Sequence, residues 1–359
     1  MIDLLNLTKT QMRELFESWG EPAYRAAQVE RWIYSGEFAT SFDAMTNLPR
    51  AQRARLTKTA RISVPPTVAE SSSVDGLTRK ALLRLDDGQT IETVLMLYPD
   101  APSSPELEEP RTAKRRTICI STQVGCPIGC PFCATGQAGY LRNLTPGEIV
   151  AQVLHFARQL APATLTNIVI MGMGEPFIKF DVTWQAIETL TDPARFGMGA
   201  RRITVSTSGE IPGIERLTRE TLRVQVNLAI SLHAPDDELR DALVPLNRKY
   251  PLQDLMRAVR AYADKTRRRV TFEYALMDGV NDKPEQARAL AQMLRGLLCH
   301  VNLIPLNPTA ASPYGRTPYE RVKAFEQVLR DAGIPTTLRV EKGSEIAAGC
   351  GQLRQASGA

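Results

Sequence analysis

The stretch CISTQVGCPIGCPFCATG, from Cys119 to Gly136, decides how the rest of this sequence is interpreted, because it contains four of the six cysteines in the chain. Cys126, Cys130 and Cys133 form a CxxxCxxC pattern, and Cys119 lies upstream of them. Proline and glycine residues alternate with the three clustered thiols and favour a loop that wraps around a ligand. Three thiolates on one loop can hold an iron–sulfur cluster or a zinc ion.

Zinc is the weaker of these two interpretations. A structural zinc site uses four ligands, and no fourth ligand follows at a similar spacing. His155 is a candidate, but it falls within a predicted helix, where a single histidine is more often exposed or packed. The spacing favours a cubane [4Fe–4S] cluster held by Cys126, Cys130 and Cys133, whose fourth iron is open to another ligand.

The length and composition are those of a soluble globular protein. The 359 residues are enough for one large domain with appendages or for two modest domains, and 43% are hydrophobic and 23% charged. No run of about 18 apolar residues occurs, and the N-terminus, MIDLLNLTKTQMREL, has no signal-peptide pattern. We therefore expect a cytoplasmic protein without membrane segments, in which clustered cysteines are metal ligands or redox catalysts.

The basic residues are partly clustered, and the net charge is +5. The clusters are RTAKRR at 111–116, ARR at 200–202 and DKTRRR at 264–269. Any single cluster of this kind is an ordinary solvated helix end or loop. Three of them in one mildly basic chain favour a polyanionic partner.

The first part of the chain has helical patterning. A capping-box sequence at Thr8–Gln11 precedes apolar residues on one helical face, and Gly20 ends that helix. A second helix is predicted from Tyr24 to Tyr34. We expect residues 1–60 to form an N-terminal helical accessory module whose apolar stripe is a packing face.

Residues 61–111 have a different character. Two β-rich runs between Lys80 and Tyr98 flank Asp86-Asp87-Gly88, which is a hairpin turn signal. They predict a β-hairpin extension. The Pro- and Ser-rich insertion at 99–115 has no periodicity and is predicted to be a surface loop.

Strands and helices alternate over the core, residues 112–345, and residues 346–359 form a C-terminal segment. The expected strands are Thr117–Ser121, Asn167–Met171, Arg202–Ser206, Val224–Leu232, Val270–Ala275, His300–Pro305 and Thr337–Val340. The expected helices are Pro146–Leu160, Val182–Leu190, Ile211–Thr218, Leu252–Lys265, Pro284–Leu297 and Pro318–Ala332. This alternation predicts an α/β fold with a parallel sheet of about six or seven βα units, which suits a partial or full barrel. Chemistry is then expected at the carboxyl ends of the strands, where GMGEP, STSG, SLHAP and PLNP lie.

The cysteine pattern, with Phe132 immediately before its last cysteine, resembles the signature of the radical S-adenosylmethionine (SAM) superfamily. The resemblance implies that SAM binds the open iron through its amino and carboxylate groups, and that one-electron reduction releases a 5′-deoxyadenosyl radical. It also implies a partial (β/α) barrel of radical SAM type, here with a small N-terminal helical module and a β-hairpin extension.

Further motifs resemble the RlmN/Cfr family of radical-dependent RNA adenine methyltransferases, and its RlmN branch in particular. Besides the cysteine stretch they are RNLTPGEI (142–149), IVIMGMGEP (168–176), TVSTSG (204–209), AISLHAP (229–235), IPLNP (304–308) and AAGCGQL (347–353). The family implies methylation of adenine C2 in 23S rRNA, with tRNA as a second substrate. It implies an electron donor such as a flavodoxin or ferredoxin system, and we expect a monomer.

The resemblance assigns roles to three residues outside the cluster motif. Cys350 matches the cysteine that becomes S-methylated, and Cys119 matches the one that resolves the protein–RNA adduct through a transient disulfide with Cys350. Glu92, in TIETVLML, matches the general base, the proton acceptor, although an outward-facing strand glutamate is its simpler interpretation. Adenine C2 is electron-poor and cannot attack a sulfonium methyl group. The family therefore uses two SAM molecules per turnover, one to methylate the protein and one to give the radical.

The SAM contacts carry over from the same motifs. Gly174 and Glu175 are expected at the amino group, where the glycine allows close backbone approach. The ribose, adenine and carboxylate are assigned to Ser206, Ser231, Leu232, His233 and Asn307. Ser344 and Gly349 depart from the family pattern near Cys350, which affects the detail of that loop.

Three alternatives stay open at this point. The sister activity, methylation of adenosine C8, shares the cysteine set, although the extended N-terminal module favours C2. A radical methylthiotransferase would need a second cysteine triad, and the spare cysteine is Cys299, which is expected in the core. A zinc-stabilised RNA-binding module without catalysis is the third. The expected RNA-binding elements are the N-terminal module and the basic clusters, because the target base must be unpaired or extruded from a folded RNA.

Overall fold

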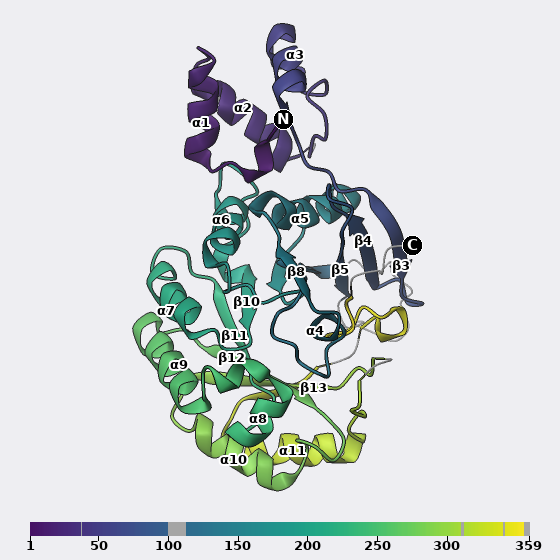
Figure 1. Ribbon diagram of the computed structural model, residues 1–359, viewed down its shortest axis with the longest axis vertical. Helices are drawn as coiled ribbons and strands as arrows, with labels where there is room; N and C mark the ends of the chain where they lie inside the picture. Colours follow the sequence, from purple (N-terminus) through teal and green to yellow (C-terminus); the bar gives the residue numbers. More distant parts are fainter. Residues whose placement is uncertain (37, 100–112, 310–311, 340–341, 355–359) are drawn as a thin grey trace.

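A computed structural model describes residues 1–36, 38–99, 113–309, 312–339 and 342–354 (Figure 1). Its main sheet has the strand order β14-β13-β12-β11-β10-β9-β6-β5-β4-β3. The strands are β3 (Thr67–Ser72), β4 (Thr78–Arg84), β5 (Thr90–Pro99), β6 (Ala113–Cys119), β9 (Asn167–Ile170), β10 (Ile203–Thr207), β11 (Asn227–Ser231), β12 (Val270–Leu276), β13 (Cys299–Pro305) and β14 (Thr336–Leu338). From β6 to β14 all neighbours are parallel, which confirms the predicted parallel sheet. The sheet order runs from β14 to β3 without closing on itself, as expected of a partial barrel.

Helices join the successive parallel strands and cover the sheet (Figure 1). They are α5 (Pro146–Leu160), α6 (Phe180–Thr191), α7 (Ile211–Glu220), α9 (Leu252–Thr266), α10 (Pro284–Leu294) and α11 (Tyr319–Asp331). Shorter elements are α4 (Ala134–Gln137), α8 (Asp237–Leu243) and the 3₁₀ helices η2 (Ala200–Arg202), η3 (Pro245–Arg248) and η4 (Ser344–Ile346). Each of the six predicted core helices is present, and α5 has the predicted bounds because a capping box between Thr145 and Glu148 begins it.

The N-terminal module contains η1 (Leu4–Asn6), α1 (Lys9–Ser18), α2 (Tyr24–Tyr34) and α3 (Arg50–Thr59). The Thr8 capping box and the bounds of α2 agree with the prediction, whereas α3 was missed. Strands β1 (Ile2–Asp3) and β2 (Ala60–Arg61) pair and bring the two ends of the module together. The module lies beyond α5 and α6 in Figure 1.

A buried ion pair joins this module to the core. The Arg195 guanidinium lies 2.6 Å from Glu30 on α2, and both side chains are almost fully excluded from solvent. The same guanidinium donates to the Leu7 carbonyl, and the Gly147 N–H donates to Asn6 Oδ1 across 2.8 Å. The module is therefore fixed to the core by bonds that are expensive to break.

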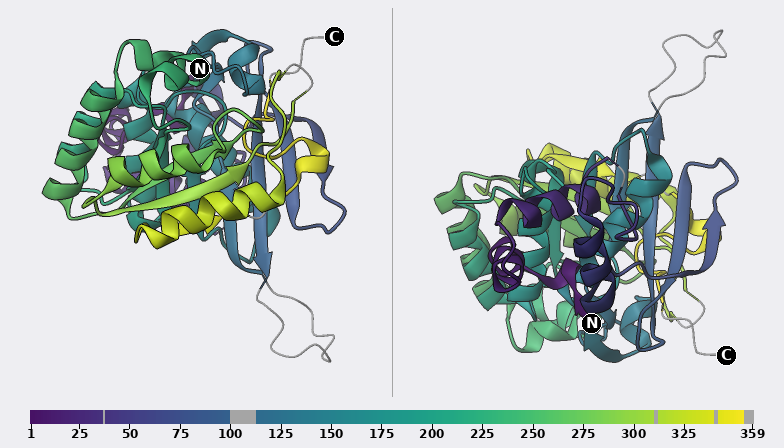
Figure 2. Two further views of the ribbon diagram at one scale, coloured as in Figure 1. Left: turned by 90° about the horizontal axis from the view of Figure 1, so that it is seen from below. Right: turned by 90° about the horizontal axis from the view of Figure 1, so that it is seen from above.

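The predicted hairpin is formed by β4 and β5, with Gly88 at a φ of +82° in the turn. Strand β5 also pairs with β6, so the hairpin continues the core sheet as its antiparallel end, and β3 adds a strand that was not predicted. Both views of Figure 2 show the C-terminal segment beside these strands. Most of the predicted surface loop, residues 100–112, lies outside the described part of the chain. Within the described residues no helix is long and apolar enough to cross a membrane.

Candidate active site

The cysteine loop is closed by a small antiparallel pair of strands, β7 (Gln123–Gly125) and β8 (Tyr140–Asn143). The Cys126 N–H donates to the Gly139 carbonyl across 2.8 Å, and the Cys133 N–H donates to the Cys130 carbonyl. Gly125 has a φ of +78°, and a Cβ on it would lie 2.0 Å from the Gly139 oxygen. The loop therefore has a fixed, tightly packed path that starts at the end of β7.

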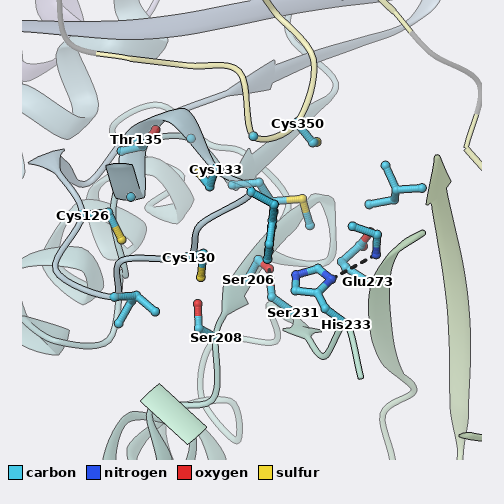
Figure 3. Close-up of a pocket in the computed structure, with 18 of the residues that line it drawn as sticks. Cys126, Cys130, Cys133, Thr135, Ser206, Ser208, Ser231, His233, Glu273 and Cys350 are labelled. Atoms are coloured by element: carbon cyan, nitrogen blue, oxygen red, sulfur yellow. Dashed lines mark hydrogen bonds between the residues drawn. The ribbon is translucent and has the colours of Figure 1, made fainter. Parts of the chain in front are cut away.

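The three clustered thiols line one cavity of about 160 Å³ (Figure 3). The cavity lies at the carboxyl ends of the parallel strands, as predicted. Its walls come from the cysteine loop, from strands β9 to β13 and the segments that follow them, and from the C-terminal segment. Figure 3 shows Cys126 and Cys130 on one side, His233 and Glu273 on the other, and Cys350 above them. This arrangement brings together the ligand candidates and the methyl-carrier candidate.

Burial dominates the electrostatics of the thiols. It raises the pKa of Cys126 to about 12, and it raises the pKa values of Cys130 and Cys133 as well, with smaller contributions from their mutual repulsion. Thiols with such raised pKa values lose their protons only when a positively charged group, such as a metal ion or cluster, binds the resulting thiolates. Among the described residues, no three His, Cys, Asp or Glu side chains converge on the position of a single metal ion. A cubane cluster binds each thiolate at a different iron atom, so it does not need such convergence.

Gly174 and Glu175 form part of the cavity wall after β9, as predicted. Gly174 has a φ of +110°, and a Cβ on it would lie 2.7 Å from the Gln123 side chain. The Glu175 carboxylate accepts hydrogen bonds from the backbone N–H groups of Ser208, at 2.7 Å, and Phe177, at 3.3 Å. Burial nevertheless raises the pKa of Glu175 to about 7. A cationic amino group of a ligand would stabilise the charged form of this carboxylate.

Ser206, Ser231 and His233 line the opposite wall. The two serine hydroxyls lie 3.3 Å apart. His233 has a φ of +61°, and its Nδ1 accepts a hydrogen bond from the Ala275 N–H across 3.0 Å. Burial, with help from Arg240, lowers the pKa of His233 to about 3, so the ring is neutral. Leu232 is fully buried and is not among the lining residues, although its N–H donates to the Glu273 carbonyl.

Asn307 connects the cavity wall to the C-terminal segment. Its Nδ2 donates to the Cys350 carbonyl across 3.3 Å, whereas its Oδ1 is buried and has no hydrogen-bond partner among the residues that the structure describes. A buried acceptor of this kind is expected to bind a donor on a ligand. The unpaired Asn307 oxygen, the Glu175 carboxylate and the three thiols around one cavity fit a cluster with bound SAM.

Cys350 reaches the cavity on a segment that other elements hold from several sides. The Ala134 N–H donates to the Gly351 carbonyl across 2.7 Å, and the Thr135 hydroxyl donates to the Leu353 carbonyl across 2.5 Å. These bonds begin on α4, directly after the last cysteine of the loop. They place Cys350 beside the predicted cluster ligands.

Cys119 ends β6, is buried and is not among the residues that line the cavity. Burial raises the pKa of its thiol to about 12, and negative charge on Cys350 contributes in the same direction. All six cysteines have free thiols in the structure. Cys299 lies in the core on β13, as predicted, and His155 on α5 is not among the residues that line the cavity.

Glu92 lies on β5 and is also buried. Its Oε1 is 2.9 Å from Lys80 Nζ, and its Oε2 accepts a hydrogen bond from the Arg354 N–H across 2.9 Å. It is not among the residues that line the cavity. The predicted base is therefore an inward-facing carboxylate that binds the C-terminal segment, and not the outward-facing strand glutamate of the simpler interpretation.

Two charged residues of the cavity wall were missed in the sequence analysis. Glu273 on β12 accepts a hydrogen bond from Asn302 across 2.8 Å, and burial raises its pKa. Arg339, just after β14, has its pKa raised mainly by Cys350 and then by Glu273. An acidic residue inside the otherwise apolar run VTFEYAL was the signal that could have identified Glu273.

Comparison with known proteins defines the class first: the sequence profile of the radical SAM superfamily matches residues 120–291. The profile described as "Ribosomal RNA large subunit methyltransferase N-terminal domain" matches residues 2–62. The structure resembles a crystal structure of a radical SAM methyltransferase from Sphaerobacter thermophilus, with a TM-score of 0.92, 52% identity and 99% of both chains covered.

The curated relatives identify the family more closely. A probable dual-specificity RNA methyltransferase RlmN of Chloroflexus aurantiacus is 52% identical over 98% of this chain and 92% of its own. The dual-specificity RNA methyltransferase RlmN of Halorhodospira halophila is 46% identical over 98% of this chain and 93% of its own. This chain belongs to the RlmN family of radical SAM enzymes.

Proposed function

We propose that this enzyme methylates C2 of an adenine in 23S rRNA and also in tRNA, through an S-methylated Cys350 and a transient protein–RNA adduct. The observation that carries the proposal is the meeting of two kinds of cysteine at one cavity. Three thiols come from the loop after β7, and Cys350 arrives on a segment more than 200 residues away. The charge of Cys350 also contributes to the raised pKa of Cys119. The names of the relatives, dual-specificity RNA methyltransferases, support the choice of substrates.

The cavity residues divide between two cofactors. Cys126, Cys130 and Cys133 would hold a [4Fe–4S] cluster, and Gly174 with Glu175 would bind the amino group of SAM. Ser206, Ser231, His233 and Asn307 would bind the rest of it, and Leu232 would contribute its backbone. When bound, the reduced cluster supplies the electron that cleaves SAM to a 5′-deoxyadenosyl radical and accepts the electron that the adduct later releases.

Cys350 then acts as the carrier. Its thiolate would attack the methyl carbon of one SAM molecule, so that the methyl group passes to the Cys350 sulfur and S-adenosylhomocysteine leaves. The S-methyl group of Cys350 would then be the donor of the hydrogen atom that the 5′-deoxyadenosyl radical takes up. The methylene carbon, still bonded to the Cys350 sulfur, adds to adenine C2 and joins the protein to the RNA.

Glu92 and Cys119 complete the reaction. The adduct loses one electron, and Glu92 accepts the C2 proton, which restores the aromatic ring. The Cys119 thiolate attacks the Cys350 sulfur, so that a disulfide forms and the bond from that sulfur to the methylene carbon breaks. The electron pair stays with the carbon, which takes up a proton and becomes the methyl group. A cytosolic dithiol reductant returns both cysteines to thiols.

The N-terminal module and the basic clusters are the proposed RNA-binding elements. Arg267–Arg269 immediately precede β12, and Arg201 and Arg202 precede β10, so both groups lie at the amino edge of the sheet, opposite the cavity. Lys114–Arg116 lie on β6. Reversing the charges of Arg267–Arg269 and Lys114–Arg116 should weaken RNA binding and reduce its salt dependence. Unchanged affinity and salt slope would contradict this assignment.

The proposal places the enzyme in the cytoplasm, because folded rRNA and tRNA are cytoplasmic substrates. It also includes a monomeric state and an electron donor such as a flavodoxin or ferredoxin system. Mass spectrometry of RNA from a strain that lacks the enzyme tests the site of methylation. Loss of 2-methyladenosine from 23S rRNA and tRNA is expected. Loss of 8-methyladenosine would assign the sister activity instead.

A further inference from the structure

Lys80 is a charged residue beside the proposed base, and the mechanism above does not use it. It lies on β4, and its Nζ is 2.9 Å from Glu92 Oε1 and 3.1 Å from the carbonyl oxygen of Ala347. Its side chain is only 13% exposed, which is uncommon for a lysine without a specific partner. The ammonium group therefore touches the proposed base and the segment that carries Cys350.

The sheet register explains why these groups meet. Lys80 is directly opposite Val94, and Val94 is directly opposite Cys119, so the three side chains form a row across β4, β5 and β6 on one face. Glu92 shares this face because it lies two residues from Val94, diagonally across from Lys80. Lys80, Glu92 and Cys119 thus share one face of the sheet, and Lys80 and Glu92 contact the C-terminal segment from it.

The pair also holds that segment on both sides of Cys350. Lys80 binds the Ala347 carbonyl, three residues before Cys350, and Glu92 Oε2 binds the Arg354 N–H, four residues after it. The proposed base and the segment that carries the proposed methyl carrier are consequently joined by hydrogen bonds. A substrate carbon attached to the Cys350 sulfur would therefore be carried on a segment that is bonded to the Glu92 carboxylate itself.

The two oxygens of Glu92 differ in what they can do during catalysis. Oε2 is bound to a backbone N–H, a neutral donor that can be released when a substrate proton approaches. Oε1 is bound to an ammonium group that is largely shielded from solvent, and separating the two charges would leave the buried carboxylate without its cation. Lys80 is the partner that stays while Oε2 takes the proton.

We propose that Lys80 is a positioning residue for the RNA methylation step: it holds the Glu92 carboxylate in place, through Oε1, for removal of the C2 proton from the adduct. This inference rests on the proposed function. It adds no chemical step, because the proton passes to Glu92 and Lys80 keeps its charge throughout.

The test compares Lys80→Met with Lys80→Arg in the cluster-loaded enzyme. Two rates are measured for each variant: methylation of Cys350 by SAM without RNA, and single-turnover methylation of a 23S rRNA fragment. In Lys80→Met the first rate should stay near the wild-type value. The second should fall roughly 10- to 100-fold, less than the roughly 10²- to 10⁴-fold loss of a whole general base, because Glu92 is still present. Lys80→Arg, which keeps a cation, should recover most of the second rate. Arg79→Met is the matched control, because Arg79 is the neighbouring basic residue on the opposite face of β4.

An isotope effect separates positioning from loss of structure. With the target adenine deuterated at C2, Lys80→Met should show a larger isotope effect than wild type, because proton removal becomes slower than the other steps. Equal RNA methylation by Lys80→Met and wild type would overturn the inference, and so would a parallel fall of both rates without a change in the isotope effect. If Lys80→Met does not fold, Lys80→Gln is measured with the same criteria. Absence of methylated product from the wild-type enzyme would instead contradict the proposed function.

Discussion

The two sides of the cavity are built in different ways. The cysteine loop is local: its thiols lie within eight residues of one another, and its hydrogen bonds join neighbours such as Cys130 and Cys133. The other side is formed by the C-terminal segment with Cys350, the proposed methyl carrier, and is called the methyl-carrier side. It is held by hydrogen bonds between residues far apart in the chain. Thr135 and Leu353 are 218 residues apart, Glu92 and Arg354 are 262 apart, and Lys80 and Ala347 are 267 apart. A local motif can bind a cofactor, whereas the reaction needs the fold to deliver a distant cysteine to it.

The largest expected effect comes from breaking the local side. Cys126→Ala removes one of the three proposed cluster ligands, so the absorbance of the cluster and the methylation of RNA should both be lost, with the rate falling at least roughly 10⁴-fold. Visible absorption and single-turnover methylation measure these effects.

Cys299→Ala is the matched control, because Cys299 is buried on β13 away from the cavity. It should keep the cluster and the activity and cost about 1 kcal/mol of stability. Retention of the cluster and the activity in Cys126→Ala would show that Cys126 is not a cluster ligand.

The second prediction concerns the wall between the two sides, where Glu175 is the proposed partner of the SAM amino group. Glu175→Gln removes a negative charge, so SAM affinity should fall roughly 10- to 100-fold, as expected for a hydrogen bond to a charged group. Titration calorimetry with the reconstituted enzyme measures the change. Glu210→Gln is a suitable control, because Glu210 caps α7 and is not among the residues that line the cavity. Equal SAM affinity in Glu175→Gln and wild type would show that the amino group binds elsewhere.

The same residue should make the stability of the SAM-free protein depend on pH. Burial raises the pKa of Glu175 from 4.5 to about 7. The protonated Glu175 carboxyl contributes to the free energy of unfolding. This contribution is fully present below about pH 4.5 and is lost as the pH rises through 7, a change on the order of 3 kcal/mol. Glu175→Gln should lack this contribution, so its advantage over wild type should grow between pH 5 and pH 8. Denaturant unfolding at several pH values tests this, and parallel curves for both proteins would contradict it.

The smallest expected effect is at the residue that connects the two sides. Asn307 donates to the Cys350 carbonyl, and its Oδ1 has no hydrogen-bond partner in the described part of the chain. Asn307→Ala removes both groups, so Cys350 methylation should slow about 10-fold, the value of one or two hydrogen bonds. Asn302→Ala, which changes the Glu273 contact instead, is the comparison variant. Equal rates for Asn307→Ala and wild type would show that Asn307 does not couple the two sides.

The same contrast explains what could be predicted from the sequence. The six core helices and the parallel strands follow from periodicity and caps, and the spacing of Cys126, Cys130 and Cys133 predicts that their thiols meet at one site, as they do at the cavity. Helix α3 was missed because its sequence, RAQRARLTKT, is polar almost throughout and gives little amphipathic signal. Strand β3 was missed because its side chains are almost all exposed, and α8 because it is short.

The methyl-carrier side was predictable only through the family resemblance. Nothing near Cys350 in the sequence indicates that Lys80 and Glu92 bind on either side of it. These contacts depend on the register between β4, β5 and β6, and a shift of one residue would turn the side chains to the other face. Arg339 was missed for the same reason, since its neighbours Cys350 and Glu273 come from other parts of the chain.

The most direct test of the central claim is Cys119→Ala. If Cys119 resolves a bond between Cys350 and the RNA, this variant should accumulate a covalent protein–RNA adduct, detected on a denaturing gel and located at Cys350 by mass spectrometry. The double variant Cys119→Ala/Cys350→Ala should give none. An adduct through Cys350 is the predicted result, and a reaction mixture with only free RNA and free protein would contradict the account.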